Sequence, residues 1–301
     1  MKVVVLAGGT GGAKIASGFQ GLLSPGELTV IANTADDDEF WGLLVSPDVD
    51  ATIYRLAGVF DESVGYGQRG DTFSTLEALG RLGEPTWFRI GDRDLATHVL
   101  RAEMLDRGCR LTETALEVGR RFGLATRVLP MSDDRVRTFF ETEIGTLSFQ
   151  EYFVREHLAP ALHAIDIRGG ESAQPTAEVQ AALAEADLVV IGPSNPLISI
   201  APILKVIGRL LRPERTVAVT PIVGGAALKG PTIEMLRALG FDASPVEVAR
   251  IYQAVAGTFV LDSRDAGVAG EVEAMGYRVL VRDTVMTDGG GALAKAIAEL
   301  F

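Results

Sequence analysis

The chain has 301 residues, of which 47% are hydrophobic, and a formal net charge of −12 at pH 7. This length and composition predict a large core in one or two domains. The acidic balance disfavours general binding to nucleic acid or to an anionic membrane surface, because both are negatively charged. A single cysteine, Cys109, excludes an internal disulfide. We expect a cytoplasmic protein with neither a signal peptide nor a membrane span.

The N-terminal segment predicts a strand, a glycine-rich loop, a helix and a second strand. The strand Lys2–Leu6 leads into the loop GGTGGAK, the helix follows at Gly12–Leu23, and the second strand covers Leu28–Asn33. A strand that feeds a glycine-rich turn and then a helix directs free N–H groups of the helix N-terminus at the loop. The pattern favours an anion site, and a tight turn without a ligand is the alternative.

The glycine-rich loop departs from both familiar phosphate-binding fingerprints. A P-loop needs Gly-Lys-Ser/Thr, but Ala13 precedes the lysine and Ile15 replaces the hydroxyl residue. A dinucleotide loop needs a third glycine where Lys14 stands, and an acid where Asn33 ends the second strand. The loop therefore predicts an anion site whose ligand is not specified.

The middle of the chain reads as helical and then as β-ribbon. Helices are expected at Thr72–Leu82, Asp92–Arg107 and Thr112–Phe122, each beginning near a hydroxyl or acidic cap. The segment WFRIGDRD suggests a short strand and a polar turn, and residues 127–149 read as three strands. These elements predict an insertion between the two ends of the core.

Short apolar strands alternate with helices again in the last third of the chain. The expected strands are Leu188–Ile191, Thr216–Thr220, Thr258–Leu261 and Arg278–Val281, and the expected helices are Ala201–Leu211, Thr232–Leu239, Pro245–Ala256, Val268–Met275 and Gly291–Leu300. This alternation predicts an α/β fold with a doubly wound, mostly parallel, Rossmann-like sheet. We assign residues 1–60 and 160–301 to this core and residues 61–159 to the inserted helical and β-ribbon region.

Polar or glycine-rich segments follow four of the predicted strands, and they should converge at the carboxyl edge of the sheet. Ser194 and Asn195 lie in GPSNP, where helix capping is the alternative to ligand binding. Gly224, Gly225 and Lys229 lie in PIVGGAALKGP, where Lys229 could bind a phosphate or could simply be solvated. Convergence of these loops is stronger evidence for a site than any one of them.

Two acidic clusters follow the second strand. Residues 36–39 read DDDE, and Asp48 and Asp50 follow in SPDVDAT, in the first turn of an expected helix. Such clusters near a phosphate loop favour Mg²⁺, although a solvated turn is the alternative. Arg89 and His98 flank the turn GDRD, which could bind an anion or could pair its own charges. No Ser–His–acid or zinc pattern is present, which leaves phosphoryl-type chemistry.

Several long motifs occur in an order that resembles the 2-phospho-L-lactate transferases of coenzyme F-420 biosynthesis. These motifs are GGTGGAK, NTADDDEFWGLLVSPDVDAT, WFRIGDRDLATH, LPMSDDRVRT, FQEYFVRE, PSNPLISIAPIL, PIVGGAALKGP and ARIY. The resemblance implies an enzyme that transfers 2-phospholactate or phosphoenolpyruvate from a guanylyl-diphospho donor to the ribityl hydroxyl of the deazaflavin Fo. It further implies release of GMP, a requirement for Mg²⁺, and a homodimer.

The resemblance also implies roles for particular residues. The nucleotide would be bound by Gly8, Gly9, Thr10, Gly11, Gly12, Lys14, Ser194, Asn195, Gly224, Gly225 and Lys229. Asp50 and Arg89 would be catalytic and would bind Fo together with Trp87 and Phe88, with Phe139 as a further ring neighbour. Asp37 and Asp50 would bind the metal, and Asp36 or Asp38 could replace Asp37. The inserted region would form the Fo pocket.

Two other functions stay open at this point. A related family with a similar opening loop binds nucleotide sugars as a regulator and is not an enzyme, but GDRDLATH and FQEYFVRE favour the transferases. A nucleotide-binding oxidoreductase is disfavoured by Lys14 and Asn33, which break the dinucleotide fingerprint.

Overall fold

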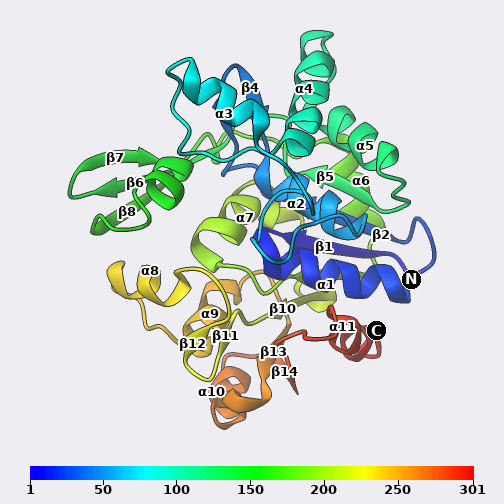
Figure 1. Cartoon of the computed structure of the whole chain (residues 1–301). Coiled ribbons are helices and arrows are strands. Elements are labelled where there is room, and N and C mark those ends of the chain that lie inside the picture. Colours follow the sequence, from blue (N-terminus) through cyan, green and yellow to red (C-terminus); the bar gives the residue numbers. More distant parts are fainter.

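A seven-stranded, entirely parallel sheet forms the centre of the molecule in the computed structural model, which describes residues 1–301 (Figure 1). The strand order is β14-β13-β10-β9-β1-β2-β5. The strands are β1 (Val3–Ala7), β2 (Leu28–Ala32), β5 (Arg127–Pro130), β9 (Leu188–Ile191), β10 (Thr216–Val219), β13 (Thr258–Asp262) and β14 (Arg278–Arg282). Central strands such as VVVLA are continuously apolar because helices cover both faces of the sheet.

Alternate residues of β1 enter the two cores of the molecule. Val3 and Val5 pack on one face beneath four helices, whereas Val4 and Leu6 pack on the other. The first face is covered by α1 (Gly9–Leu22), α2 (Pro47–Leu56), α5 (Leu111–Arg121) and α11 (Gly291–Ala298); the second is covered by α6 (Ala177–Glu185), α7 (Ala201–Ile207), α8 (Thr232–Ala238), α9 (Pro245–Tyr252) and α10 (Ala269–Ala274). The alternation follows from the two-residue period of a strand.

The direction of chain progression reverses between β1 and β9. Strands β2 and β5 extend the sheet on one side of β1, and β9, β10, β13 and β14 extend it on the other. Such a reversal opens a crevice at the carboxyl ends of the two strands, which is where ligands bind in open α/β sheets. Glycines allow the loops to approach closely here, because a Cβ on Gly11 would lie 2.0 Å from the carbonyl oxygen of Pro193.

Smaller elements surround this crevice. An antiparallel sheet contains β6 (Arg137–Thr142), β7 (Gly145–Ser148) and β8 (Leu162–Arg168), and two hairpins contain β3 (Asp38–Phe40) with β4 (Leu43–Val45) and β11 (Ile222–Val223) with β12 (Ala226–Ala227). The remaining helices are α3 (Ser74–Arg81), α4 (Asp92–Asp106), η1 (Glu151–Arg155), η2 (Pro196–Ile200), η3 (Gly208–Leu210), η4 (Pro213–Arg215) and η5 (Ser263–Val268). In Figure 1 the three-stranded sheet projects from one side of the molecule.

The predicted fold class is confirmed, with differences in individual elements. Residues 87–91 form no strand, so the strand expected in WFRIGDRD is wrong. The strand at Arg127–Pro130 pairs with β2 in the central sheet instead of with the ribbon, and β8 joins the ribbon instead of the core. The first helix begins at Gly9 rather than Gly12. The division into residues 1–60 with 160–301 and residues 61–159 stays a prediction. No helix has the length and apolarity needed to cross a membrane.

The approach of α1 to the end of β1 provides a test of the fold. A Cβ on Gly12 would lie 2.6 Å from the Cα of Ala7, whereas a Cβ on Gly21 of the same helix would meet nothing within 4 Å. We expect Gly12→Ala to lower the free energy of unfolding by roughly 1–3 kcal/mol through overpacking. Gly21→Ala is the control and should not destabilise the protein, because alanine favours helix. Urea unfolding of both variants makes the measurement, and equal stabilities would contradict the packing.

Candidate functional site

Two adjoining cavities lie at the carboxyl ends of the central strands. We call the first the loop cavity; its volume is about 450 Å³ and the loops after β1, β9 and β10 line it. We call the second the aromatic cavity; its volume is about 400 Å³ and it contains most of the ring side chains discussed below. The residues common to both linings are Gly9, Thr10, Pro47, Asp48, Gln150 and Val154. Ligands in the two cavities would therefore meet beside Asp48.

The loop cavity brings together most of the residues predicted to bind a nucleotide. Its lining includes Gly8, Gly9, Thr10, Gly11, Lys14, Ser194, Asn195 and Lys229. The Nζ of Lys229 lies 3.1 Å from Oγ1 of Thr10, so the loop after β10 reaches across to the loop after β1. Burial lowers the pKa of Lys229, which nevertheless remains a suitable cation for a phosphate.

Three of the predicted nucleotide residues lie outside this lining, and two others have structural partners. Gly12 is buried behind the loop, where its N–H donates to Oγ of Ser194 at 3.1 Å. Gly224 and Gly225 form the turn of the β11–β12 hairpin, and the N–H of Gly224 donates to Asp265. Asn195 caps η2 by accepting from the N–H of Leu197, as the capping alternative anticipated.

The aromatic cavity contains the residues predicted to bind Fo. Trp87, Phe88, Arg89 and Asp50 line it, together with Tyr54, Phe60 and Tyr66. Phe40 of β3 stacks on Phe88 with 3.9 Å between ring centroids, and this contact fixes one wall. Arg89 is exposed and lies over the ring of Phe73. Phe139 does not line the cavity and instead packs against Arg168.

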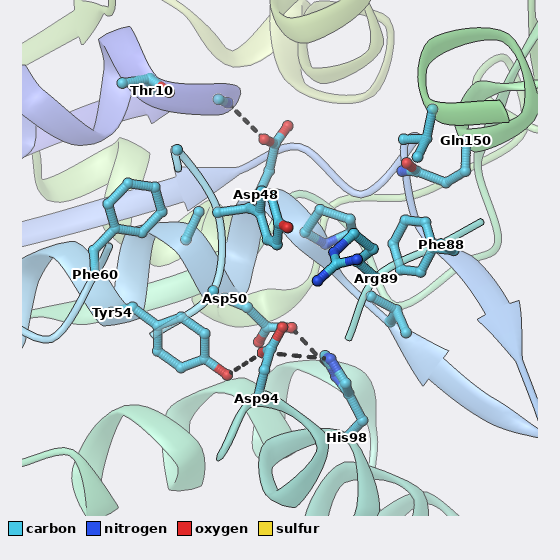
Figure 2. Close-up of a pocket in the computed structure, with 18 of the residues that line it drawn as sticks. Thr10, Asp48, Asp50, Tyr54, Phe60, Phe88, Arg89, Asp94, His98 and Gln150 are labelled. Atoms are coloured by element: carbon cyan, nitrogen blue, oxygen red, sulfur yellow. Dashed lines mark hydrogen bonds and ion pairs between the residues drawn. The ribbon is translucent and has the colours of Figure 1, made fainter. Parts of the chain in front are cut away.

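Asp48 connects the two cavities. It lies in the first turn of α2, where Oδ1 accepts the N–H of Gly9 at 2.6 Å and Oδ2 accepts the side-chain amide of Asn33 at 3.0 Å. Burial raises the pKa of Asp48 to about 6. Asp36 also borders the loop cavity, and burial together with the nearby Asp48 raises its pKa well above the usual range. Asp48 thus accepts a backbone N–H at the start of α1 (Figure 2), and a second buried carboxyl group, that of Asp36, borders the same cavity.

Asp50 lies two residues after Asp48 in α2 and lines the aromatic cavity. Its Oδ1 accepts from Arg101 of α4, and its Oδ2 has no hydrogen-bond partner. The Nδ1 of His98 lies 3.7 Å from that free oxygen, and the Nε2 of His98 lies 3.4 Å from Oδ1 of Asp94 (Figure 2). Tyr54 donates to Asp94 at 2.8 Å. Two predicted residues, Asp50 and Arg89, therefore share this cavity with a network from α4.

Asp37 lies away from both cavities. It borders a third cavity of about 580 Å³ between the β3–β4 hairpin, the end of α4 and Arg137. Neither of its carboxylate oxygens has a hydrogen-bond partner. Burial raises the pKa of Asp37 to about 7, against the opposing charge of Arg137. Asp50 is among the charges that act on Asp37, so the two predicted metal ligands are electrostatic neighbours.

The carboxylates fit a magnesium ion only in part. No group of three or more His, Cys, Asp or Glu side chains is arranged to hold a metal. Asp36, Asp37 and Asp50 nevertheless each have at least one buried carboxylate oxygen without a partner. Mg²⁺ commonly uses one or two carboxylates and takes its other ligands from water and substrate phosphates. Asp36 and Asp50, which line the two adjoining cavities, fit that mode of binding, whereas Asp37 lies away from both.

Several residues at the site have no role in the sequence-based site prediction. Asp48 belongs to an acidic cluster that favours Mg²⁺ and His98 flanks a turn that could bind an anion, but their spacing alone did not show which cavity each faces. Arg101 is fully buried and holds Asp50, and its only sequence signal was its position three residues after His98 on the same helix. Gln150 is buried and donates to the carbonyl of Asp36, a contact across 114 residues that no local pattern indicates.

The fold and site define an α/β protein with two cavities that meet at a carboxylate, and comparisons identify its family. Residues 3–285 match the family described as 2-phospho-L-lactate transferase CofD. The chain is 38% identical over 303 residues to the 2-phospho-L-lactate transferase of Methanosarcina acetivorans, with 99% of each chain covered. It is 39% identical over 312 residues to the phosphoenolpyruvate transferase of Streptomyces griseus, covering 100% of this chain and 98% of the relative.

The chain therefore belongs to the 2-phospho-L-lactate transferase family, and the predicted resemblance is confirmed. This membership makes a transferase the supported class of enzyme. A solved structure of a UPF0052 family member from Bacillus halodurans is similar with a TM-score of 0.63 and 15% identity, covering 99% of this chain and 98% of that one. At this identity the similarity supports the fold alone.

The raised pKa of Asp37 predicts a pH dependence of stability. Between the ordinary value of 3.8 and about 7, the folded protein retains a proton that the unfolded chain has lost. The free energy of unfolding therefore falls as pH rises through this window. The asparagine in Asp37→Asn cannot ionise. Between pH 4 and pH 8, the free energy of unfolding of this variant should therefore rise by roughly 2–4 kcal/mol relative to that of the unchanged protein.

Urea unfolding in EDTA across this pH range measures the effect. Asp242→Asn, at an exposed position, is the control and should follow the unchanged protein. An unaltered pH slope in Asp37→Asn would contradict the assignment of the buried proton to Asp37.

Proposed function

We propose that the protein transfers 2-phospholactate or phosphoenolpyruvate from its guanylyl-diphospho donor to the ribityl hydroxyl of the deazaflavin Fo and releases GMP. The main support for this proposal is that the loop cavity and the aromatic cavity share Thr10, Pro47 and Asp48 in their linings. A transferase must hold donor and acceptor so that their reacting atoms touch. Relatives that bear the names 2-phospho-L-lactate transferase and phosphoenolpyruvate transferase support both choices of acid.

The loop cavity suits the donor nucleotide. The N-terminus of α1 offers backbone N–H groups and a partial positive charge to a diphosphate. Lys14 and Lys229 add two cations to the lining of a protein that has few lysines. Ser194 and Asn195 lie at the topological switch point and supply polar groups for the nucleoside.

The aromatic cavity suits the flat acceptor. Trp87, Phe88 and Tyr54 offer ring faces and edges that a deazaflavin could pack against, and Arg89 offers a cation at the rim. The ribityl chain would extend toward Asp48 and Asp50. Its hydroxyl oxygen forms a bond to the phosphorus next to the acid while the bond between that phosphorus and the bridging diphosphate oxygen breaks. GMP leaves with the bridging oxygen, and the hydroxyl proton passes to a carboxylate.

The residues at the junction would supply most of the rate acceleration through positioning and charge. Of the magnesium ligands that the family resemblance implies, Asp50 lines the acceptor cavity, Asp36 as the alternative to Asp37 borders the donor cavity, and Asp37 borders neither. Bound Mg²⁺ would neutralise the diphosphate and the developing charge on GMP. Asp48 holds the N-terminus of α1 in place through Gly9.

The direct test is an assay of binding and product. Fo fluorescence is followed on titration with protein and Mg²⁺, and the two guanylyl-diphospho donors are then added and the products weighed by mass spectrometry. A phosphodiester of Fo together with GMP is expected, and the preferred donor identifies the acid. Absence of Fo binding combined with uptake of a UDP-sugar would replace this proposal with the nucleotide-sugar-binding regulatory function.

The two cavity lysines give a prediction that separates donor from acceptor. We expect Lys14→Ala and Lys229→Ala each to raise KM for the donor by about 10-fold or more, because each removes a cation from the phosphate site. The affinity for Fo should stay within about 2-fold. Lys205→Ala is the control, since Lys205 pairs with Glu171 away from both cavities. Steady-state kinetics and Fo titration make the measurements, and equal effects on donor and Fo would contradict separate cavities.

A further inference from the structure

Buried side chains in the middle of α4 form a hydrogen-bond network with Asp50. None of the roles proposed above for site residues involves this network. Arg101 is only 1% exposed and reaches Oδ1 of Asp50, Nδ1 of His98 at 3.1 Å and the carbonyl of Leu44 at 3.2 Å. An arginine side chain has donors and no acceptor. A hydrogen bond from Arg101 can therefore be accepted only by an Nδ1 that carries no proton.

The remaining nitrogen of His98 must then hold the ring proton. Its Nε2 faces Oδ1 of Asp94 at 3.4 Å, and Asp94 is held in turn by the hydroxyl of Tyr54 at 2.8 Å. Tyr54 is also linked to Thr97 at 2.7 Å, so the orientation of Asp94 is fixed from α2 and α4 together. Carboxylates lie near both ring nitrogens of His98, and the nearer one is Asp94 on the Nε2 side.

This tautomer leaves one oxygen of Asp50 without a donor. Arg101 directs one nitrogen to Oδ1 of Asp50 and the other to His98, and His98 turns its unprotonated nitrogen toward Oδ2 of Asp50 at 3.7 Å. Oδ2 is buried and has no hydrogen-bond partner, although Asp50 lines the aromatic cavity. A buried carboxylate oxygen without a hydrogen-bond donor lowers the stability of the fold, unless a bound ligand supplies the missing donor.

We propose that Arg101 and His98 are positioning residues that hold Asp50 with Oδ2 as the acceptor for the attacking hydroxyl of the substrate. The inference rests on the proposed function, and it assigns Asp50 to the hydroxyl rather than to a metal. The hydroxyl O–H bond breaks, its proton passes to Oδ2, and its oxygen forms the new bond to phosphorus as GMP departs. Arg101 keeps Oδ1 occupied, so the proton has one destination.

A double-mutant cycle on kcat tests this positioning role. We expect Arg101→Met to lower kcat by about 100-fold while KM for donor and Fo stays within about 3-fold. In the Asp50→Asn background, the same change should lower the single-turnover rate by less than about 3-fold, because its effect acts through Asp50. Arg101→Lys should recover at least about 10-fold of the lost rate, since lysine can still donate to Oδ1.

The cycle includes its own folding controls. Asp50→Asn with Arg101→Met removes both charges together, which avoids an unpaired buried charge. Arg215→Met changes a half-buried arginine that contacts the carbonyl of Ala186, and it should leave kcat unchanged. Equal losses from Arg101→Met in both backgrounds, or no loss at all, would overturn the positioning role.

The tautomer of His98 is a readout that does not depend on activity. The chain has three histidines, so nitrogen-15 NMR of labelled protein resolves them, and the signals lost in His98→Gln identify His98. We expect a neutral ring with the proton on Nε2, and a proton on Nδ1 would refute the network. A correct tautomer in an unchanged protein that forms no product would refute the proposed function, and the positioning role would fall with it. If product forms but the effects of Arg101→Met and Asp50→Asn on the rate are additive, the positioning role is refuted and the proposed function stands.

Discussion

The hydrogen bonds to Asp48 hold the site together. One carboxylate oxygen accepts the N–H of Gly9 at the start of α1, and the other accepts the amide of Asn33 at the end of β2. A buried carboxylate is tolerated when such partners surround it. Through them the first turn of α2 is fixed against the carboxyl ends of β1 and β2. Both cavities take part of their lining from this junction, so their relative placement depends on one side chain.

Asp50 lies two residues further along the same helix and faces the second cavity. The two carboxylates have different surroundings because residues two apart in a helix point in different directions around its axis. Asp48 joins loops within the protein, whereas Asp50 is held by Arg101 through one oxygen and has no hydrogen-bond partner at the other. The first turn of α2 therefore carries two buried carboxyl groups with different surroundings.

Much of the fold could be predicted from local patterns. Strands such as Leu188–Ile191 are short apolar runs between turn residues, and the observed bounds match the prediction. Some errors are local, such as the strand expected in WFRIGDRD, and others are long-range. The strand Arg127–Pro130 looks like part of a ribbon, and only its pairing with β2 in register with Thr29 and Val30 places it in the central sheet. Sheet membership depends on partners distant in sequence, which a local pattern does not contain.

The site, like the fold, could be predicted from local patterns only in part. Glycine-rich loops after strands predict a crevice at the switch point, and eight of the eleven predicted nucleotide residues line the loop cavity. Gly224 and Gly225 instead make a hairpin turn, which a glycine pair in a loop predicts equally well. Arg101 had no sequence signal of its own, because its partner Asp50 lies 51 residues away. Side-chain direction and long-range pairing set these roles.

The proposed function requires the two adjoining cavities to hold a guanine nucleotide and Fo at the same time. The most direct measurement is an Fo fluorescence titration with and without saturating GDP and Mg²⁺. We expect a ternary complex, in which Fo binds as tightly or more tightly when GDP is present. Competition between GDP and Fo for one site, or loss of Fo binding in the presence of GDP, would contradict it.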